Sequence, residues 1–171
     1  MQNQKVLPFK NTEDRFAKIQ IAELSVAEQT SLIQLAVAIL ERQHRPGQAL
    51  SSPGETRDYL QLLLAEHRNE VFGMLLMDNR HRIRAIEELF QGTLDGASVY
   101  SRVVVQKALE HNAGAVVFFH NHPSGLPEPS RADETITRRL KDALKLIDVR
   151  VLDHIIVGAE GTVSFAERGL L

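Results

Sequence analysis

The chain has 171 residues, 43% of them hydrophobic, which suffices to bury the core of one domain, or of one domain plus an extension. Its formal net charge of -2 provides no broad basic field, so composition gives no support to tight non-specific binding of nucleic acid. The sequence contains no cysteine, which excludes disulfides and thiolate zinc sites and leaves His, Asp and Glu to hold any metal.

The N-terminal sequence lacks the apolar core of a signal peptide, and no apolar run reaches membrane-spanning length. We therefore expect a cytoplasmic protein with no membrane partner. Residues 1–50 are interpreted as an N-terminal tail and a single helix, which runs from Ser25 to about Arg42 with two adjacent apolar stripes. Residues 51–171 are interpreted as the functional domain.

The first half of this domain begins with a short helix near Ser52-Pro53. The nearly continuous apolar run from Glu70 to Met77 predicts a central strand that is covered on both faces. Residues 78–80 are typical of a turn, and a return strand follows from about Ile83.

The second half alternates helices and strands. We expect a helix at 101–111, a buried strand at 113–119 that runs into His120, and a helix that starts after Ser130. Strands at 149–158 and 162–165 complete the chain. The elements together predict an α/β fold, with a mixed sheet that has an antiparallel component and helices on its flanks.

The segment HNHPSGLPEPSRAD, residues 120–133, contains a potential metal site. His120 and His122 are two residues apart, so in extended chain both side chains point to one face. The next seven residues contain three prolines and a glycine, which predicts a stiff, sharply turning loop. Such a loop brings Asp133 in the next helix under the histidines. Two imidazoles and a carboxylate are the protein ligands of a catalytic zinc site, whose fourth position is open to water.

Other interpretations explain parts of this segment. A His-x-His pair can lie in a loop that binds no metal. Ser130 and Asp133 also match a capping box, so Ser130 either only caps the helix or also bonds a reacting group. The full combination of spacings arises by chance in roughly one chain in a thousand at average residue frequencies. The combination therefore favours a metal site.

The spacing of His120, His122, Ser130 and Asp133 resembles that of the JAMM (JAB/MPN-type) metallohydrolases, and the surrounding residues resemble the RadC branch of that group. The resemblance covers about residues 52–171 and rests on Pro123-Ser124-Gly125, Pro129-Ser130, Leu152 to Gly158, Ser164-Phe165 and Glu167. It implies a JAB/MPN (cytidine deaminase-like) core and a Zn²⁺ ion. It also implies hydrolysis of a peptide or isopeptide bond in a protein or peptide substrate.

A hydrolase of this kind needs a general base for its water. JAMM enzymes place a glutamate at the start of an apolar strand, in a pattern similar to Glu70-Val71-Phe72-Gly73 here. The expected strand directions independently support Glu70 as this base. The turn at 78–80 and a crossover helix at 101–111 make the strand from 113 antiparallel to the strand from 70. Glu70 and His120 should then lie at the same end of the sheet.

Other acidic and histidine side chains are weaker candidates. Glu87, Glu88 and Glu128 are interpreted as surface charges, and Glu128 could also line an entrance to the site. His154 lies in an otherwise apolar strand, which is more typical of a satisfied core residue than of a side chain that supports the site.

Two alternative functions stay open. One is a protein associated with DNA repair or recombination, as the RadC name suggests, with nucleic acid as a partner that the net charge does not support. The other is a non-catalytic binding module on the same fold. RadC sequences usually pair an arginine with a glutamate where this chain has Arg102-Val103, which is a departure from the pattern.

Overall fold

The computed structural model describes residues 19–43, 46–47, 49, 52–64, 67–92 and 99–171. The chain forms two compact units, residues 1–36 and 37–171. A short 3-10 helix, η1 (Ile21–Glu23), precedes α1 (Val26–Gln43), and the boundary between the two units falls within α1. Ser25 starts α1, because its backbone N–H donates to the Glu28 carboxylate at 2.8 Å. The predicted helix from Ser25 is confirmed, while residues 1–18 of the expected tail lie outside the described residues.

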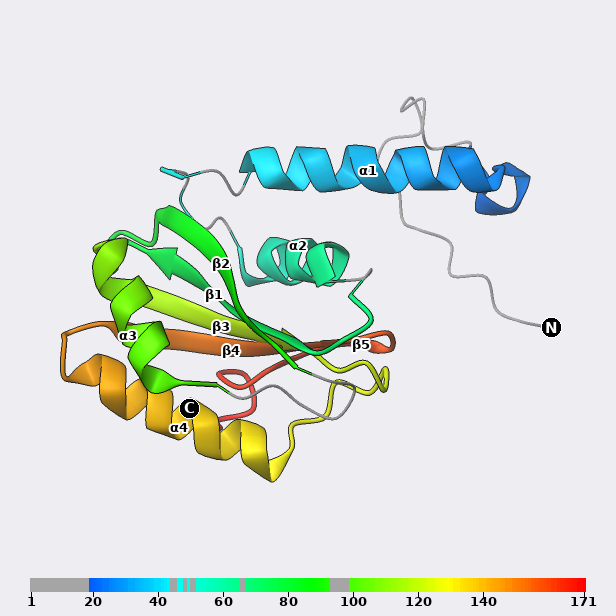
Figure 1. Ribbon diagram of the computed structural model, residues 1–171. Helices are drawn as coiled ribbons and strands as arrows, with labels where there is room; N and C mark the ends of the chain where they lie inside the picture. Colours follow the sequence, from blue (N-terminus) through cyan, green and yellow to red (C-terminus); the bar gives the residue numbers. More distant parts are fainter. Residues whose placement is uncertain (1–18, 44–45, 48, 50–51, 65–66, 93–98) are drawn as a thin grey trace. The chain divides into compact units, whose positions relative to one another are not determined.

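The second unit contains a five-stranded sheet in the order β2-β1-β3-β4-β5, with α2 on one face and α3 and α4 on the other (Figure 1). Its elements follow the predicted order. They are α2 (Pro53–Leu64), β1 (Val71–Met77), β2 (Ile83–Gln91), α3 (Ser101–Glu110), β3 (Ala115–Asn121), α4 (Arg131–Lys145), β4 (Arg150–Gly158) and β5 (Gly161–Ser164).

The strand directions place the start of β1 beside the end of β3. β1 runs antiparallel to both of its neighbours, β2 and β3. β3 and β4 are parallel, joined by the α4 crossover, and β5 returns antiparallel to β4. In this register Phe72, which is two residues after Glu70, lies opposite His120. The predicted antiparallel relation of the strands from 70 and 113 is confirmed, as is the mixed α/β sheet.

Because successive side chains of a strand point to opposite faces, the sheet separates two hydrophobic cores. The α2 side encloses Leu60, Leu75 and Phe119, among others. The α3–α4 side encloses Phe72 and Phe118 together with the apolar face of α4. Among the residues that the structure describes, no helix is long and apolar enough to cross a membrane.

Candidate metal centre

His120 and His122 lie at the C-terminal end of β3 and just beyond it. His120 is the sixth residue of the strand, and its side chain is buried at 1% exposure against Phe72, with ring centroids 6.2 Å apart. His122 is held beside β4, because its backbone N–H donates to the Val157 carbonyl at 2.8 Å. The parallel pairing of β3 with β4 therefore continues to the second histidine.

The loop after His122 packs closely against the end of β4. Gly125 adopts a positive φ of 91°, and its carbonyl accepts the Glu160 N–H at 3.1 Å. A Cβ on Gly158 would collide with that same carbonyl, so the approach requires glycine at this position. The Leu126 carbonyl, further along the loop, accepts a hydrogen bond from His122 Nδ1 at 2.8 Å. The loop thus leaves His122 Nε2 free to face the centre.

Asp133 is placed by the first turn of α4. Ser130 is the N-cap: its Oγ accepts from the Asp133 N–H at 3.1 Å, and the Asp133 carboxylate accepts from the Ser130 N–H at 2.7 Å. This reciprocal pair is the capping box that the sequence indicates. The structure therefore gives Ser130 a structural task, and its contact with a reacting group stays a prediction.

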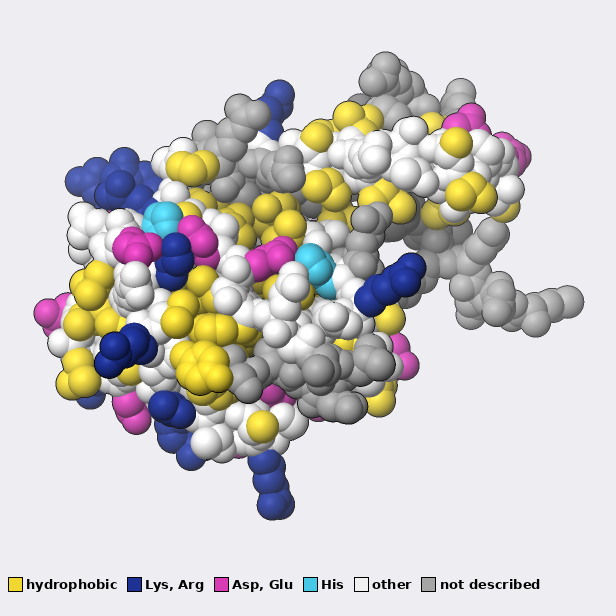
Figure 2. Space-filling view, viewed as in Figure 1, with side chains coloured by type: hydrophobic (Ala, Val, Ile, Leu, Met, Phe, Trp, Pro, Cys, Tyr) yellow, Lys and Arg dark blue, Asp and Glu magenta, His cyan; other side chains and the backbone are white. Residues whose placement is uncertain are grey.

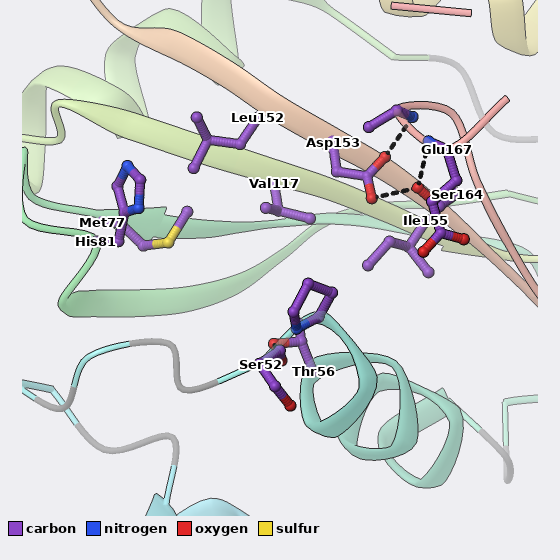
Figure 3. A pocket seen from close by; sticks show the side chains of 12 residues that line it. Ser52, Thr56, Met77, His81, Val117, Leu152, Asp153, Ile155, Ser164 and Glu167 are labelled. Atoms are coloured by element: carbon purple, nitrogen blue, oxygen red, sulfur yellow. Dashed lines mark hydrogen bonds between the residues drawn. The ribbon is translucent and has the colours of Figure 1, made fainter. Parts of the chain in front are cut away.

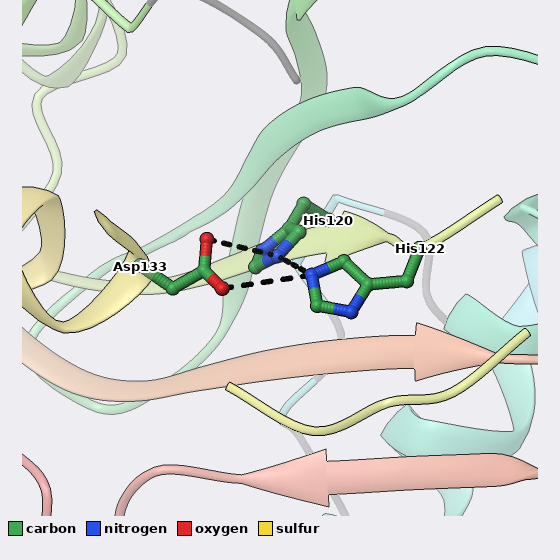
Figure 4. Close-up of side chains that lie close together, drawn as sticks. All are labelled: His120, His122 and Asp133. Atoms are coloured by element: carbon green, nitrogen blue, oxygen red, sulfur yellow. Dashed lines mark hydrogen bonds and ion pairs between the residues drawn. The ribbon is translucent and has the colours of Figure 1, made fainter. Parts of the chain in front are cut away.

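Three possible ligand atoms converge between these elements (Figure 4). His120 Nε2 lies 2.9 Å from His122 Nε2 and 3.4 Å from Asp133 Oδ1, and the second Asp133 oxygen lies 3.5 Å from His122 Nε2. All three side chains are largely buried, with 1%, 17% and 14% of their area exposed. Two imidazole nitrogens and a carboxylate form a donor set that fits Zn²⁺.

The charges at the centre also suit a cation. Burial, with a further contribution from His122, lowers the pKa of His120 to about 4 against the attraction of Asp133, so His120 is neutral at pH 7. The hydrogen bond to Asp133 raises the pKa of His122, helped by the charge of Glu70. Burial alone would raise the pKa of Asp133, but its hydrogen bonds to His122 and to Ser130 outweigh burial and lower the pKa. The carboxylate is therefore ionised.

Glu70 lies at the edge of this centre, as the topology argument predicts. It directly precedes β1 and is half-buried, and its backbone carbonyl accepts the Gly92 N–H at 2.8 Å. Asn121, between the two histidines, holds this segment: its side chain accepts the Val71 N–H at 2.7 Å and donates to the Asn69 carbonyl at 3.1 Å. The negative charge of Glu70 contributes to the raised pKa of His122.

Sequence reasoning undervalued His154 and missed Thr137. His154 is fully buried, and its Nε2 lies 2.8 Å from His120 Nδ1. Its Nδ1 lies 2.6 Å from the hydroxyl of Thr137, which also donates to the Asp133 carbonyl at 2.6 Å. Burial, with the neighbouring His120, lowers the pKa of His154, so it is neutral. One feature of the sequence could have pointed to this contact: Thr137 is a polar residue on the apolar face of α4, four positions after Asp133.

The remaining acidic candidates form ion pairs with residues outside the His120–His122–Asp133 group. Glu128 accepts two hydrogen bonds from the Arg168 guanidinium, at 2.6 and 2.9 Å. Glu87 bonds His111 at 2.8 Å, and Glu88 lies 3.2 Å from His67. These partners agree with the interpretation of the three glutamates as surface charges. Val103, at the position that departs from the RadC pattern, is half-buried on α3.

A hollow of ≈ 330 Å³ lies on the opposite face of the sheet, between the start of α2 and strands β3 and β4 (Figure 3). Its lining includes Thr56, Val117 and Ile155 and none of the three possible ligands. It is thus separate from the metal centre.

On the molecular face drawn in Figure 2, Lys and Arg side chains are interspersed with Asp and Glu, which adds no support to the nucleic-acid alternative.

Comparison with known proteins agrees with the resemblance to RadC. The family model described as RadC-like JAB domain matches residues 50–170. A UPF0758 protein of Halorhodospira halophila is 52% identical over 155 residues, which are 91% of this chain and 69% of that protein. One from Thioalkalivibrio sulfidiphilus is 62% identical over 73% of this chain and 56% of its own length. One from Vibrio cholerae is 52% identical over 82% of this chain and 88% of its own.

Proposed function

The chain belongs to the family of RadC-like JAB domains, and from that premise we propose that it is a zinc-dependent hydrolase of peptide or isopeptide bonds. The observation that carries the proposal is the convergence of His120, His122 and Asp133 on one point at the end of β3. A bound zinc ion would lower the pKa of a water molecule and polarise the carbonyl of the scissile bond.

The chain's own residues supply the rest of the chemistry. His120, His122 and Asp133 would hold the ion, and their partial burial keeps bulk water from competing. Glu70 would take a proton from the attacking water and return it to the leaving nitrogen. Its place directly before β1, whose Phe72 lies opposite His120, supports this role. The substrate would be a protein or peptide.

Metal content is the first test. Untagged protein purified without chelator should contain about one zinc ion per chain by elemental analysis, since the site has one set of three ligands. The double variant H120A/H122A should contain none, and its thermal unfolding should show that it is folded. Wild-type protein that stays free of zinc even after zinc is added back would contradict the proposal.

Catalysis is tested with Glu70→Gln, which keeps the size of the side chain but cannot accept a proton. The variant should retain zinc and lose roughly 10²–10⁴-fold of any turnover found in a screen of peptide and isopeptide substrates. Glu110→Gln is the matched control, because Glu110 lies exposed on α3 and bonds Lys107. Full activity of the Glu70 variant would rule out this base.

A further inference from the structure

A row of buried hydrogen bonds links two of the ligand residues behind the metal centre. It runs from His120 Nδ1 to His154 Nε2 at 2.8 Å, then from His154 Nδ1 to the Thr137 hydroxyl at 2.6 Å. The row ends where the Thr137 hydroxyl donates a hydrogen bond to the Asp133 backbone carbonyl at 2.6 Å. The side chains of His120, His154 and Thr137 are each at most 1% exposed. Solvent therefore has almost no access to the row.

Only one direction of proton donation fits these contacts. The Asp133 carbonyl can only accept, so the single hydroxyl proton of Thr137 is used there. Thr137 must then accept from His154 Nδ1–H. A charged imidazole would be costly between the rings of Phe72, Phe118 and Phe165, whose centroids are 4.7 to 5.9 Å away, so His154 carries its single proton on Nδ1 and none on Nε2. His154 Nε2 accordingly accepts from His120 Nδ1–H.

We propose that His154 and Thr137 are positioning residues. They hold His120 in the tautomer in which Nε2, the nitrogen that faces the metal centre, carries no proton. The opposite tautomer would place a proton on Nε2, where a metal ion must bind. The inference rests on the proposed function for the identity of the metal, whereas the tautomer is a property of the protein alone.

A purely space-filling role does not explain the two polar side chains. An imidazole and a hydroxyl without partners would each cost stability at this depth, and apolar residues of the same shape would pack equally well. A threonine on the other face of the sheet provides the contrast. Thr56 in α2 is equally buried and donates to the carbonyl of Ser52, the residue just before its helix, four residues back at 3.2 Å. Thr137 makes the same bond and in addition accepts from His154.

The test compares Thr137→Val, which removes the hydroxyl at nearly constant shape, with Thr137→Ser, which keeps it, and with Thr56→Val on the other face. Long-range ¹H–¹⁵N spectra of metal-free protein report which ring nitrogens carry protons. We expect His120 in the Nδ1–H form in wild type and T137S, and a mixture of tautomers in T137V. Zinc affinity, measured by competition with a chromophoric chelator, should fall roughly 10–100-fold in T137V. It should stay near the wild-type value in T137S and T56V.

Two results would overturn the proposal: an Nε2–H tautomer of His120 in metal-free wild type, or wild-type zinc affinity in T137V. The wild-type spectrum decides the point even if T137V fails to fold. If wild type shows the Nδ1–H tautomer but binds no zinc, the proposed function fails while the role of His154 and Thr137 in setting the tautomer stands. The two hypotheses are thereby separated.

Discussion

The α2 face of the sheet encloses mainly apolar side chains such as Leu60 and Phe119, whereas the α3–α4 face also encloses His120, His154 and Thr137. Both faces bury apolar side chains, so both contribute hydrophobic stabilisation. The buried polar side chains of the α3–α4 face bond to one another in a row that ends at the metal centre. One face thus mainly stabilises the fold, whereas the other also contacts the candidate metal ligands.

Leu60→Ala should have the largest effect on stability. Leu60 is fully buried on the α2 face, and truncation leaves a cavity whose cost is roughly 2–5 kcal/mol of the free energy of unfolding. Urea denaturation measures this loss, and chelator competition on the folded protein should give zinc affinity close to wild type. A large fall in zinc affinity would break the proposed separation of the two faces.

Asn121→Ala probes the link between the ligands and Glu70. The side chain points away from the two histidines, as alternate residues of a strand do, and bonds the backbone of Asn69 and Val71. Losing the first of these bonds leaves the buried Val71 N–H unpaired, at roughly 1–3 kcal/mol, whereas the exposed Asn69 carbonyl can bond to water. We expect lower stability in urea and any hydrolysis to fall, with zinc content unchanged. Loss of zinc would show instead that Asn121 is needed for ligand geometry.

Gly158→Ala should disturb the loop that orients His122. The added Cβ would overlap the Gly125 carbonyl, so the loop must shift, at roughly 1–3 kcal/mol by thermal unfolding. Zinc affinity should fall, because the Leu126 carbonyl would move from His122. Gly54→Ala is the control, since in α2 its Cβ would approach Ser52 Oγ no closer than 3.9 Å. That variant should be at least as stable as wild type, with unchanged zinc affinity.

Asp78→Asn should have the smallest effect, at the end of the sheet far from the ligands. Asp78 accepts from the Arg80 and Arg82 backbone and from the Arg82 guanidinium. These hydrogen bonds, of which the bond from the Arg82 backbone contributes most, lower the pKa of Asp78 from 3.8 to about 2. Desolvation opposes this shift but is outweighed. A lowered folded-state pKa stabilises above pH 3.8, and the stabilisation is lost as the pH falls to about 2.

The urea midpoint of D78N should therefore lie below that of wild type at pH 6, and the gap should narrow at pH 3. Zinc affinity at pH 7 should be the same in both proteins. A gap that is constant between pH 6 and pH 3 would mean that the Asp78 charge does not stabilise the turn.

Local patterns in the sequence were sufficient for most of the fold. The apolar run from Val71 to Met77, the Ser130–Asp133 capping box and the periodic apolar face of α4 each depend on residues close in the chain. Turn chemistry and the crossover rule then predicted that β1 and β3 are antiparallel, which the register confirms. The ligand candidates came from spacing alone, because a strand end, a stiff loop and a helix start place His120, His122 and Asp133 together.

The partners of those ligands were decided only by tertiary structure. His154 and His120 are 34 residues apart, and Asn121 bonds Val71 across 50 residues, so neither contact leaves a periodic signal in the sequence. Reading His154 as a satisfied core histidine was correct for its burial but missed its partner. A sequence records which side chains are available, whereas strand register and the depth of burial decide which nitrogen carries a proton.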